Sequence, residues 1–373
     1  MKIGIITMHK VLNYGSALQA YALQQKLLSL GYENELIDYQ YPRPVAKKKT
    51  IKSFFSSVVI FIRNAIIGFP LEKKKRKFDL FYNQNFKLSK EYYTYESLQS
   101  NPPQYDVYIT GSDQVWNPRF AGNDSNFFLS FAPDDKPKLS YAASFATSVI
   151  EDDKKGFYSK YLSRYDSISV RENTGVKLVK ELTGKDAVLC CDPTILLTSE
   201  EWDKLAIQSQ LEIKYKYILV YVLNYMIGDI YPEIQRTIDY VQKTLGYKVI
   251  YLVGRKEDAF RKNSFLYKKG GPAEFIYLFK HAEFVITTSF HGVAFSLIYD
   301  KPLLGVVNMD KVDDTRIQSL LSVSGAENSV MDFRDKINMS ATELLNLKGD
   351  KARFNTLREA SECYLRKSVA CAC

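Results

Sequence analysis

The sequence predicts an α/β protein with two Rossmann-like domains that face a cleft, and three observations support this expectation. Short apolar runs alternate with amphipathic helical segments along both halves of the chain, a pattern typical of parallel sheets covered by helices. The first half opens with a strand, a glycine-containing loop, a helix and a second strand, which together form a βαβ unit. A chain of 373 residues is also long enough to bury two such cores.

The N-terminal domain is expected over residues 1–200. Its strands are predicted over residues 2–7, 35–39, 105–110, 138–145, 166–172 and 187–193, and its helices over residues 16–30 and 174–182. Gly31 follows the first helix and is the residue type that most often ends one. Because ligands of such folds bind beyond the carboxyl ends of the strands, we expect the loops at residues 12–15 and 111–117 to form the site.

The C-terminal domain is expected over residues 201–373. Its strands are predicted over residues 217–223, 248–254, 283–288 and, as the last one, 302–307, with helices over residues 230–245, 273–281 and 293–299. The run over residues 217–223 is apolar throughout, which is typical of a parallel strand covered on both faces. We expect the helices beyond residue 340 to pack back on one of the two domains, with the N-terminal domain as a candidate.

The net charge of +9 comes from one stretch of the chain. Between Lys47 and Lys77 ten cations face the single anion Glu72, so the rest of the chain is neutral overall. Nucleic-acid binding is therefore not expected, because it would need basic residues spread along a groove. The ten cations are Lys47, Lys48, Lys49, Lys52, Arg63, Lys73, Lys74, Lys75, Arg76 and Lys77.

The same stretch lies in a basic and apolar insertion expected over residues 44–80. Its apolar part, residues 54–69, is too short and too interrupted by Arg63 and Asn64 to be a transmembrane helix. Two interpretations stay open. Residues 47–77 can make a peripheral contact with an anionic membrane surface, or they can form a surface helix with basic linkers that folds against its own domain.

Cysteine usage indicates a reducing compartment. Five cysteines, an odd number in a long chain, do not form a disulfide framework. Cys190 and Cys191 end a predicted strand, where cysteine is usually a small apolar residue. Cys371 and Cys373 are a weak candidate for a metal or redox pair, and we predict no metal site. The first strand begins without a preceding signal peptide, so we expect a cytoplasmic protein.

The chain has three histidines, of which His291 is the best candidate for catalysis. It follows a buried apolar strand and lies at the start of a predicted helix. An imidazole at that point suits proton transfer near neutral pH, and the helix amides beside it favour an anion. The alternative is a structural turn histidine. His281 ends a helix and is explained by the helix dipole or by exposure, whereas His9 could contact a ligand.

Three further polar residues lie at the ends of predicted strands or directly after them. Asp113 and Gln114 could bind sugar hydroxyls or cap a helix. Arg171 suits a bidentate clamp for a carboxylate or phosphate, with an ion pair to Glu172 as the structural alternative.

Two glycines mark positions where the backbone can approach a neighbour closely. Gly15 would let the backbone reach a ligand at the start of the first helix. Gly292 fits the same role, or close packing of a helix on a strand. The chain has no P-loop, no full dinucleotide glycine fingerprint and no serine nucleophile elbow.

Six motifs carry a resemblance to a known family, the polysaccharide pyruvyl transferases. Each motif is weak alone, but the six occur in the family's order over residues 1–321, which makes the match specific. The motifs are Asn13-Tyr14-Gly15 with Leu18-Gln19-Ala20-Tyr21-Ala22-Leu23 behind it, Gly111-Ser112-Asp113-Gln114-Val115-Trp116-Asn117, Ser169-Val170-Arg171-Glu172, Asp192-Pro193, Ser289-Phe290-His291-Gly292 and Thr315-Arg316.

The resemblance implies a fold similar to GT-B glycosyltransferases and a role in exopolysaccharide or capsule biosynthesis. The implied reaction moves pyruvate from phosphoenolpyruvate, as co-substrate, onto two hydroxyls of one sugar in a polysaccharide or lipid-linked precursor, forming a cyclic ketal. No metal or organic cofactor is implied. The catalytic residues would be His291 and Arg171, the donor-binding residues Ser289, Phe290, Gly292, Arg316 and Gly15, and the acceptor or cleft residues Asn13, Tyr14, Ser112, Asp113, Gln114 and Asn117.

The chain departs from the family at one position. Many members carry an arginine two residues before the histidine, where this chain has Ser289. Arg171 and Arg316, or Lys10 and Arg255, would then have to hold the donor anions, or the donor differs. Two alternatives follow: a GT-B glycosyltransferase that uses a nucleotide sugar, and a non-enzymatic scaffold docked on a membrane.

Overall fold

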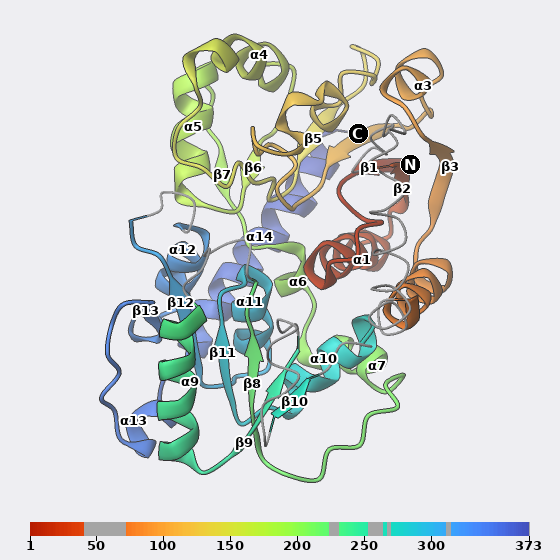
Figure 1. Cartoon of the computed structure of the whole chain (residues 1–373). Helices are drawn as coiled ribbons and strands as arrows, with labels where there is room; N and C mark the ends of the chain where they lie inside the picture. The colour runs from red at the N-terminus through yellow and green to blue at the C-terminus, as the bar shows by residue number, and fades with distance from the viewer. Residues whose placement is uncertain (41–71, 224–230, 253–263, 267–269, 311–314, 373) are drawn as a thin grey trace, which may run out of the picture.

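Two parallel β-sheets, each covered by helices, make up the protein (Figure 1). The computed structural model describes residues 1–40, 72–223, 231–252, 264–266, 270–310 and 315–372. The first sheet has the strand order β3-β2-β1-β4-β5 and the second the order β10-β9-β8-β11-β12-β13. In both sheets the order reverses beside the first strand, β1 or β8. Folds of this kind bind ligands at that reversal, outside the carboxyl ends of the strands.

The first sheet is extended beyond β5 by two short strands. β6 and β7 pair with each other, and isolated bridges join Leu139 to Ser167 and Ala143 to Val170. Gly31 has a φ of +87°, the left-handed conformation expected of a residue that ends a helix, here α1. The elements are β1 (Lys2–Ile6), α1 (Tyr14–Ser29), β2 (Glu33–Tyr39), a helix over residues 72–85, β3 (Leu88–Tyr92), α3 (Tyr95–Ser100), β4 (Val107–Thr110), β5 (Lys138–Ser140), α4 (Asp152–Leu162), β6 (Ser169–Val170), α5 (Asn173–Thr183) and β7 (Val188–Leu189).

The second sheet is built around β8, whose five residues are all buried. Such a strand needs helices on both faces, which explains its continuous apolar sequence. The elements are β8 (Tyr217–Tyr221), α9 (Tyr231–Leu245), β9 (Lys248–Tyr251), β10 (Ser264–Leu266), α10 (Pro272–His281), β11 (Phe284–Thr287), α11 (Phe290–Ile298), β12 (Leu303–Val307), α12 (Thr315–Val323), β13 (Val330–Asp332) and α13 (Ala341–Leu345).

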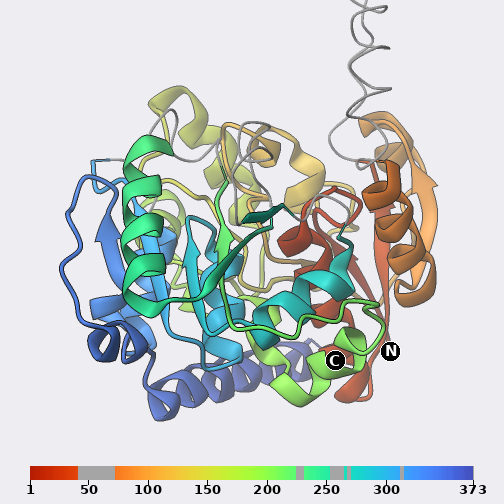
Figure 2. The same cartoon turned by 60° about the horizontal axis from the view of Figure 1, so that its bottom comes forward.

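Three further helices connect the two halves: α6 (Pro193–Leu196), α7 (Ser199–Ala206) and α14 (Lys351–Cys371). The last of these runs from the second half back to the first, and it crosses behind both in Figure 1 and along the lower edge in Figure 2. On α14 the Ser361 hydroxyl accepts a hydrogen bond from the backbone N–H of Cys191 at 2.8 Å, and Arg358 Nε donates to the Ile195 carbonyl at 2.7 Å. One hydrophobic cluster contains buried side chains of both halves and of α14.

Of the basic stretch over residues 47–77, the structure describes residues 72–77, which belong to the helix over residues 72–85. Its apolar side packs on α1, with the Phe78 ring 5.2 Å from that of Tyr14, and Lys77 forms an ion pair with Glu274 of α10. The rest of the insertion expected over residues 44–80 lies outside the described residues. No helix in the described part of the chain is long and apolar enough to cross a membrane.

Three edge strands were not predicted from the sequence. The expectation that residues 302–307 form the last strand was wrong, because β13 pairs in parallel with β12 beyond it. β3 shows why edge strands were missed: four of its five residues are partly or fully exposed, so it lacks an apolar run. The helix predicted from residue 293 begins at Phe290, which places His291 in the first turn of α11.

Candidate active site

A small polar cavity lies between the two halves of the protein. The start of α1 and the loops after β4 and β6 form one wall of the cavity. The loop after β8 and the starts of α11 and α12 form the other. Each half of the protein therefore contributes only part of the site. The residues lining the cavity are Asn13, Ser16, Asp113, Gln114, Arg171, Leu223, Thr288, Ser289, Phe290, His291 and Arg316.

A tight turn between β11 and α11 presents His291. Ser289 is the N-cap of α11, and its hydroxyl accepts a hydrogen bond from the backbone N–H of Gly292 at 3.4 Å. A Cβ on Gly292 would lie 2.2 Å from Thr287 Oγ1, so only glycine allows the helix to start this close to the strand. Close packing therefore accounts for Gly292.

Gly15 of α1 accommodates the His291 ring from the other half of the protein. A Cβ on Gly15 would lie 2.0 Å from His291 Nδ1. The sequence suggested that the space above Gly15 would admit a ligand, but the imidazole fills it. Asn13 caps this helix, and its side chain accepts from the N–H groups of Gly15 and Ser16. Packing of His291 on α1 thus places a side chain of the second half against the first.

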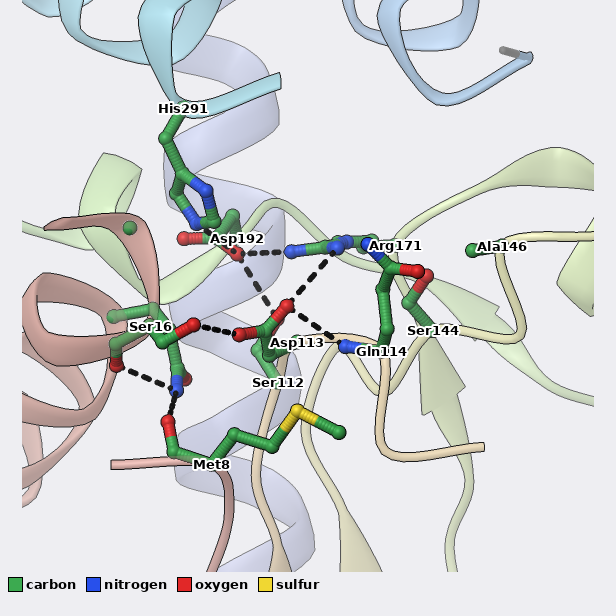
Figure 3. Close-up of polar contacts among 12 residues, drawn as sticks. Met8, Ser16, Ser112, Asp113, Gln114, Ser144, Ala146, Arg171, Asp192 and His291 are labelled. Atoms are coloured by element: carbon green, nitrogen blue, oxygen red, sulfur yellow. Dashed lines mark hydrogen bonds and ion pairs between the residues drawn. The ribbon is translucent and has the colours of Figure 1, made fainter. Parts of the chain in front are cut away.

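Asp192 links the charged residues of the site (Figure 3). Its Oδ2 atom lies 2.8 Å from Arg171 Nη1, 3.0 Å from Ser112 Oγ and 3.6 Å from His291 Nε2. Its Oδ1 atom accepts from both the N–H and the hydroxyl of Thr194, as the N-cap of α6. Burial alone would raise the pKa of the Asp192 carboxyl, but the charges of His291 and Arg171 and the donated hydrogen bonds hold that pKa well below its usual range.

Arg171 is buried, with only 1% of its side chain exposed. Its Nη1 atom binds Asp192, whereas Nε and Nη2 have no hydrogen-bond partner among the described residues. The Glu172 carboxylate, which the sequence suggested as an ion-pair partner, lies 4.0 Å from Nε, so Asp192 is the closer partner. Phe290 places its ring 4.4 Å from the guanidinium carbon. Buried donors without partners are costly, so these two nitrogens indicate a ligand with acceptor oxygens.

Asp113 faces the same cavity from the loop after β4. It has a φ of +75°, which aspartate tolerates better than most residues. Its Oδ2 atom accepts from Ser16 Oγ at 2.5 Å and its Oδ1 atom from the backbone N–H of Gln114 at 2.8 Å. The Gln114 side chain is held in turn by Asn117, whose Nδ2 donates to Gln114 Oε1 at 2.7 Å. Asp113 therefore binds a hydroxyl and a loop amide and does not cap a helix.

The structure separates the predicted site residues into three groups. Eight line the cavity: His291, Arg171, Ser289, Phe290, Arg316, Asn13, Asp113 and Gln114. Four support these from behind: Gly15, Gly292, Ser112 and Asn117.

Tyr14 forms the third group, since it points away from the cavity. Its hydroxyl donates to the Gly270 carbonyl at 2.8 Å, and its ring stacks on Phe275 at 4.8 Å. Of the two extra cations considered for the donor, Lys10 binds Asp38 at 2.5 Å and Arg255 lies outside the described residues.

Sequence reasoning missed four residues of the site. Ser16, Leu223 and Thr288 line the cavity, and Asp192 connects its charges. Asp192 was noted only as part of a motif, although an Asp-Pro pair after a strand marks a helix start close to the strand ends. Within the described ranges, no group of three or more His, Cys, Asp or Glu side chains could hold a metal ion.

Two parallel sheets with this strand order and a polar site between them define a fold similar to GT-B, as the sequence predicted. Three solved structures are similar in fold: Methanocaldococcus jannaschii UDP-GlcNAc 2-epimerase in complex with UDP-GlcNAc and UDP (TM-score 0.51, 11% identity, covering 97% of this chain and 99% of that one), S. aureus MnaA with UDP (0.50, 12%, 98% and 92%) and Arabidopsis thaliana UGT89C1 with UDP-L-rhamnose (0.51, 10%, 100% and 98%). Identities this low show the fold alone.

The family follows from the sequence itself. The model of the polysaccharide pyruvyl transferase family matches residues 13–310, and the chain belongs to that family. The resemblance is thereby confirmed over residues 13–310, which contain five of the six motifs, and the sixth, Thr315-Arg316, lies beyond the match. A comparison with curated proteins gave no match.

Gly15→Ala should test whether the histidine needs its place on α1. The added methyl group would overlap the imidazole, and if the ring takes part in the reaction, its displacement by about 1 Å can cost roughly a hundredfold in rate. We therefore expect the folded variant to transfer pyruvate roughly a hundredfold more slowly than wild type. Gly156→Ala is the matched control, because nothing lies within 4 Å of its new methyl group on α4. Equal rates for the two variants would contradict the prediction.

Asp192→Asn should test the charge network through its pH dependence. Because folding lowers the pKa of this carboxyl, its ionised form stabilises the native state at every pH above the ordinary aspartate value of about 4. That stabilisation is lost only at more acid pH. We therefore expect the variant to have a lower free energy of unfolding in urea at about pH 7, and by at least as much at about pH 5, because the carboxylate also attracts a protonated His291 ring.

Asp186→Asn provides the control for removal of a carboxylate. The Asp186 side chain is 93% exposed and pairs only with the exposed Lys180 among the described residues, so the change should have little effect at either pH. If the difference in unfolding free energy between wild type and Asp192→Asn becomes smaller from about pH 7 to about pH 5, the carboxyl titrates in that range and the prediction is wrong.

Proposed function

We propose that this protein transfers pyruvate from phosphoenolpyruvate onto two hydroxyls of one sugar and forms a cyclic ketal, with His291 as general acid and base. The acceptor would be a polysaccharide or a lipid-linked oligosaccharide precursor. The observation that carries the proposal is the placement of the His291 imidazole on the same cavity as the two unbonded nitrogens of Arg171. Reaction of phosphoenolpyruvate requires one group that gives it a proton and another that binds its anionic groups.

Phosphoenolpyruvate carries a carboxylate and a phosphate. Arg171 Nε and Nη2 suit one of these anions, and a guanidinium binds either in a bidentate manner. The N-terminus of α11 and Arg316 suit the other. The position of Arg316 on the cavity wall supports it as the replacement for the family arginine, because the short side chain of Ser289 is used to cap α11.

The chemistry requires a proton at the methylene carbon of the donor. His291 would deliver it, and the resulting oxocarbenium centre would accept an acceptor hydroxyl. Phosphate then leaves as the second hydroxyl closes the ring. The Asp192 carboxylate, 3.6 Å from His291 Nε2, attracts the protonated form of the ring and helps to hold it in place.

A nucleotide-sugar glycosyltransferase is the second candidate. The fold supports it, since two of the similar structures contain a UDP-sugar. His291 and Arg171 would then hold a diphosphate. Thermal unfolding with phosphoenolpyruvate and, separately, with UDP-sugars distinguishes the two functions, because the true donor stabilises the native state.

His291→Ala should lower the rate of ketal formation by about a hundredfold or more, because general acid–base catalysis contributes at least that factor. The rate is measured as phosphate release from phosphoenolpyruvate with a mixture of methyl hexopyranosides, and the ketal methyl group is identified by NMR. His281→Ala, at the end of α10 and outside the cavity, is the control. A His291→Ala rate within a few-fold of wild type would rule out this role.

The place in the cell where the protein acts is part of the same proposal. We propose a cytoplasmic enzyme that contacts the inner face of the membrane through residues 47–77. The described end of this stretch supports the idea, because Phe78 faces α1 while Lys73, Lys75 and Arg76 remain exposed. Replacement of these three cations by glutamate should reduce flotation with anionic vesicles, since each basic residue near such a surface contributes about 1 kcal/mol.

Charge reversal elsewhere provides the control for flotation. The exposed lysines of three other helices, Lys177, Lys243 and Lys367, are suitable. Flotation that is equal for both triple variants and wild type would exclude a contact through the helix over residues 72–85.

A further inference from the structure

We propose that Asp113 is the second catalytic group of the site, the base that takes the proton from an acceptor hydroxyl as that hydroxyl attacks. The proposal rests on the proposed pyruvyl transfer and assigns a role on the acceptor side of the reaction. It divides the proton transfers between two side chains, with His291 serving the donor and Asp113 the acceptor.

The balance of the reaction shows why two groups are useful. His291 gives one proton to the methylene carbon, which becomes a methyl group and leaves C2 electrophilic. The first hydroxyl forms a C–O bond to C2 and loses its proton. The second hydroxyl forms another C–O bond, the bond from C2 to the phosphate oxygen breaks, and the second proton leaves with hydrogen phosphate. One hydroxyl proton thus replaces the proton that His291 gave away. A base close to the acceptor must collect it first.

The carboxylate of Asp113 is suited to that task by position. It lines the same cavity as His291, Arg171 and Arg316. Its backbone is fixed in the left-handed region, and its carbonyl accepts from the N–H of Ser144 at 3.0 Å. Such conformations cluster at functional sites, because the surrounding structure must hold them in place.

The bonds that Asp113 already makes show that it accepts a hydrogen bond from a hydroxyl group. Ser16, which lines the same cavity, donates a hydrogen bond from Oγ to Asp113 Oδ2 at 2.5 Å. An acceptor sugar brings hydroxyls of the same kind. A carboxylate has about four lone-pair sites, so Oδ1, bound to one backbone N–H, has room for a further donor. A carboxylate is also the usual base for addition of a hydroxyl to an oxocarbenium-like centre, where the attacking oxygen becomes strongly acidic.

Asp192, the other carboxylate of the site, does not suit this task. Both of its oxygens are occupied, Oδ2 by Arg171 and Ser112 and Oδ1 by Thr194, and it is not part of the cavity wall. Arg171 binds Asp192 closely at 2.8 Å but lies 3.7 Å from Asp113, beyond hydrogen-bond distance. Asp113 has one donor on each oxygen and lines the cavity, so it is the carboxylate that an acceptor hydroxyl can reach.

The charges between the two catalytic groups alternate in sign. His291 faces Asp192, Asp192 binds Arg171, and Arg171 faces Asp113 (Figure 3). When His291 loses a proton at one end and Asp113 gains one at the other, the net charge of the chain is unchanged. This matters in a buried site, where an uncompensated charge is costly.

The test uses the positive φ of Asp113. Glycine adopts this conformation freely, so Asp113→Gly removes the carboxylate without backbone strain and leaves space for a small acid. We expect phosphate release from phosphoenolpyruvate with the methyl hexopyranoside mixture to fall by about a hundredfold or more, and the Kd for phosphoenolpyruvate to stay within roughly threefold. Added formate should restore part of the rate in this variant. A merely structural role would not respond to formate.

Two variants complete the design. Asp300→Gly makes the same change at another aspartate of positive φ, 50°, outside the cavity, and should keep the wild-type rate. Asp113→Asn keeps the shape of the side chain without its basicity. It should show the same loss of rate and the same donor affinity, without rescue by formate. It decides the question if Asp113→Gly does not fold.

The outcomes separate cleanly. Either Asp113 variant with more than about a tenth of the wild-type rate would overturn the proposal. So would a loss of phosphoenolpyruvate binding that matches the loss of rate, because Asp113 would then only position Arg171. Wild-type protein that neither binds phosphoenolpyruvate nor releases phosphate from it would instead overturn the proposed function, and this role of Asp113 with it.

Discussion

The buried ion pair between Arg171 and Asp192 is the interaction on which the site depends. Two charges removed from water cost free energy, and their attraction compensates only when further hydrogen bonds satisfy both groups. Here Ser112 and Thr194 complete the shell of the carboxylate, while two nitrogens of the guanidinium remain unbonded. The pair is therefore satisfied on the protein side and unsatisfied on the cavity side. The proposed role of Arg171 in binding an anion rests on that asymmetry.

The same pair ties together segments that are distant in the sequence. Arg171 follows β6, Asp192 begins α6, and His291, which faces Asp192 from α11, belongs to the other sheet. Gly15 and Gly292 then fix the ring from two sides, because one admits the imidazole and the other brings α11 close to β11. The geometry of the histidine is thus set by packing between the halves as much as by its own turn.

The sequence predicted those parts of the molecule that have a local signal. Central strands such as β8 are continuous apolar runs, and their alternation with helices was enough to give the fold. Edge strands such as β3 are partly exposed, so they lack such a run. His291 could be predicted because a strand, a turn and a helix surround it in the sequence. Asp192 and Ser16 could not, because their roles depend on partners about 20 to 100 residues away in the chain, Arg171, His291 and Asp113.

Tyr14 illustrates a further limit of the sequence. It stands between two residues that serve the site, Asn13 and Gly15, yet its own side chain packs between α1 and α10. Residues that are adjacent at a helix start point in different directions, and the choice among them depends on tertiary packing.

The return of α14 to the first half has a mechanical consequence. The chain crosses between the halves twice, once through α6 and α7 and once through α14, which is anchored to the first half by Ser361 and Arg358. A second connection restricts the relative movement of the two halves more than a single connection would. It therefore helps to keep the imidazole of His291 packed against Gly15 of α1.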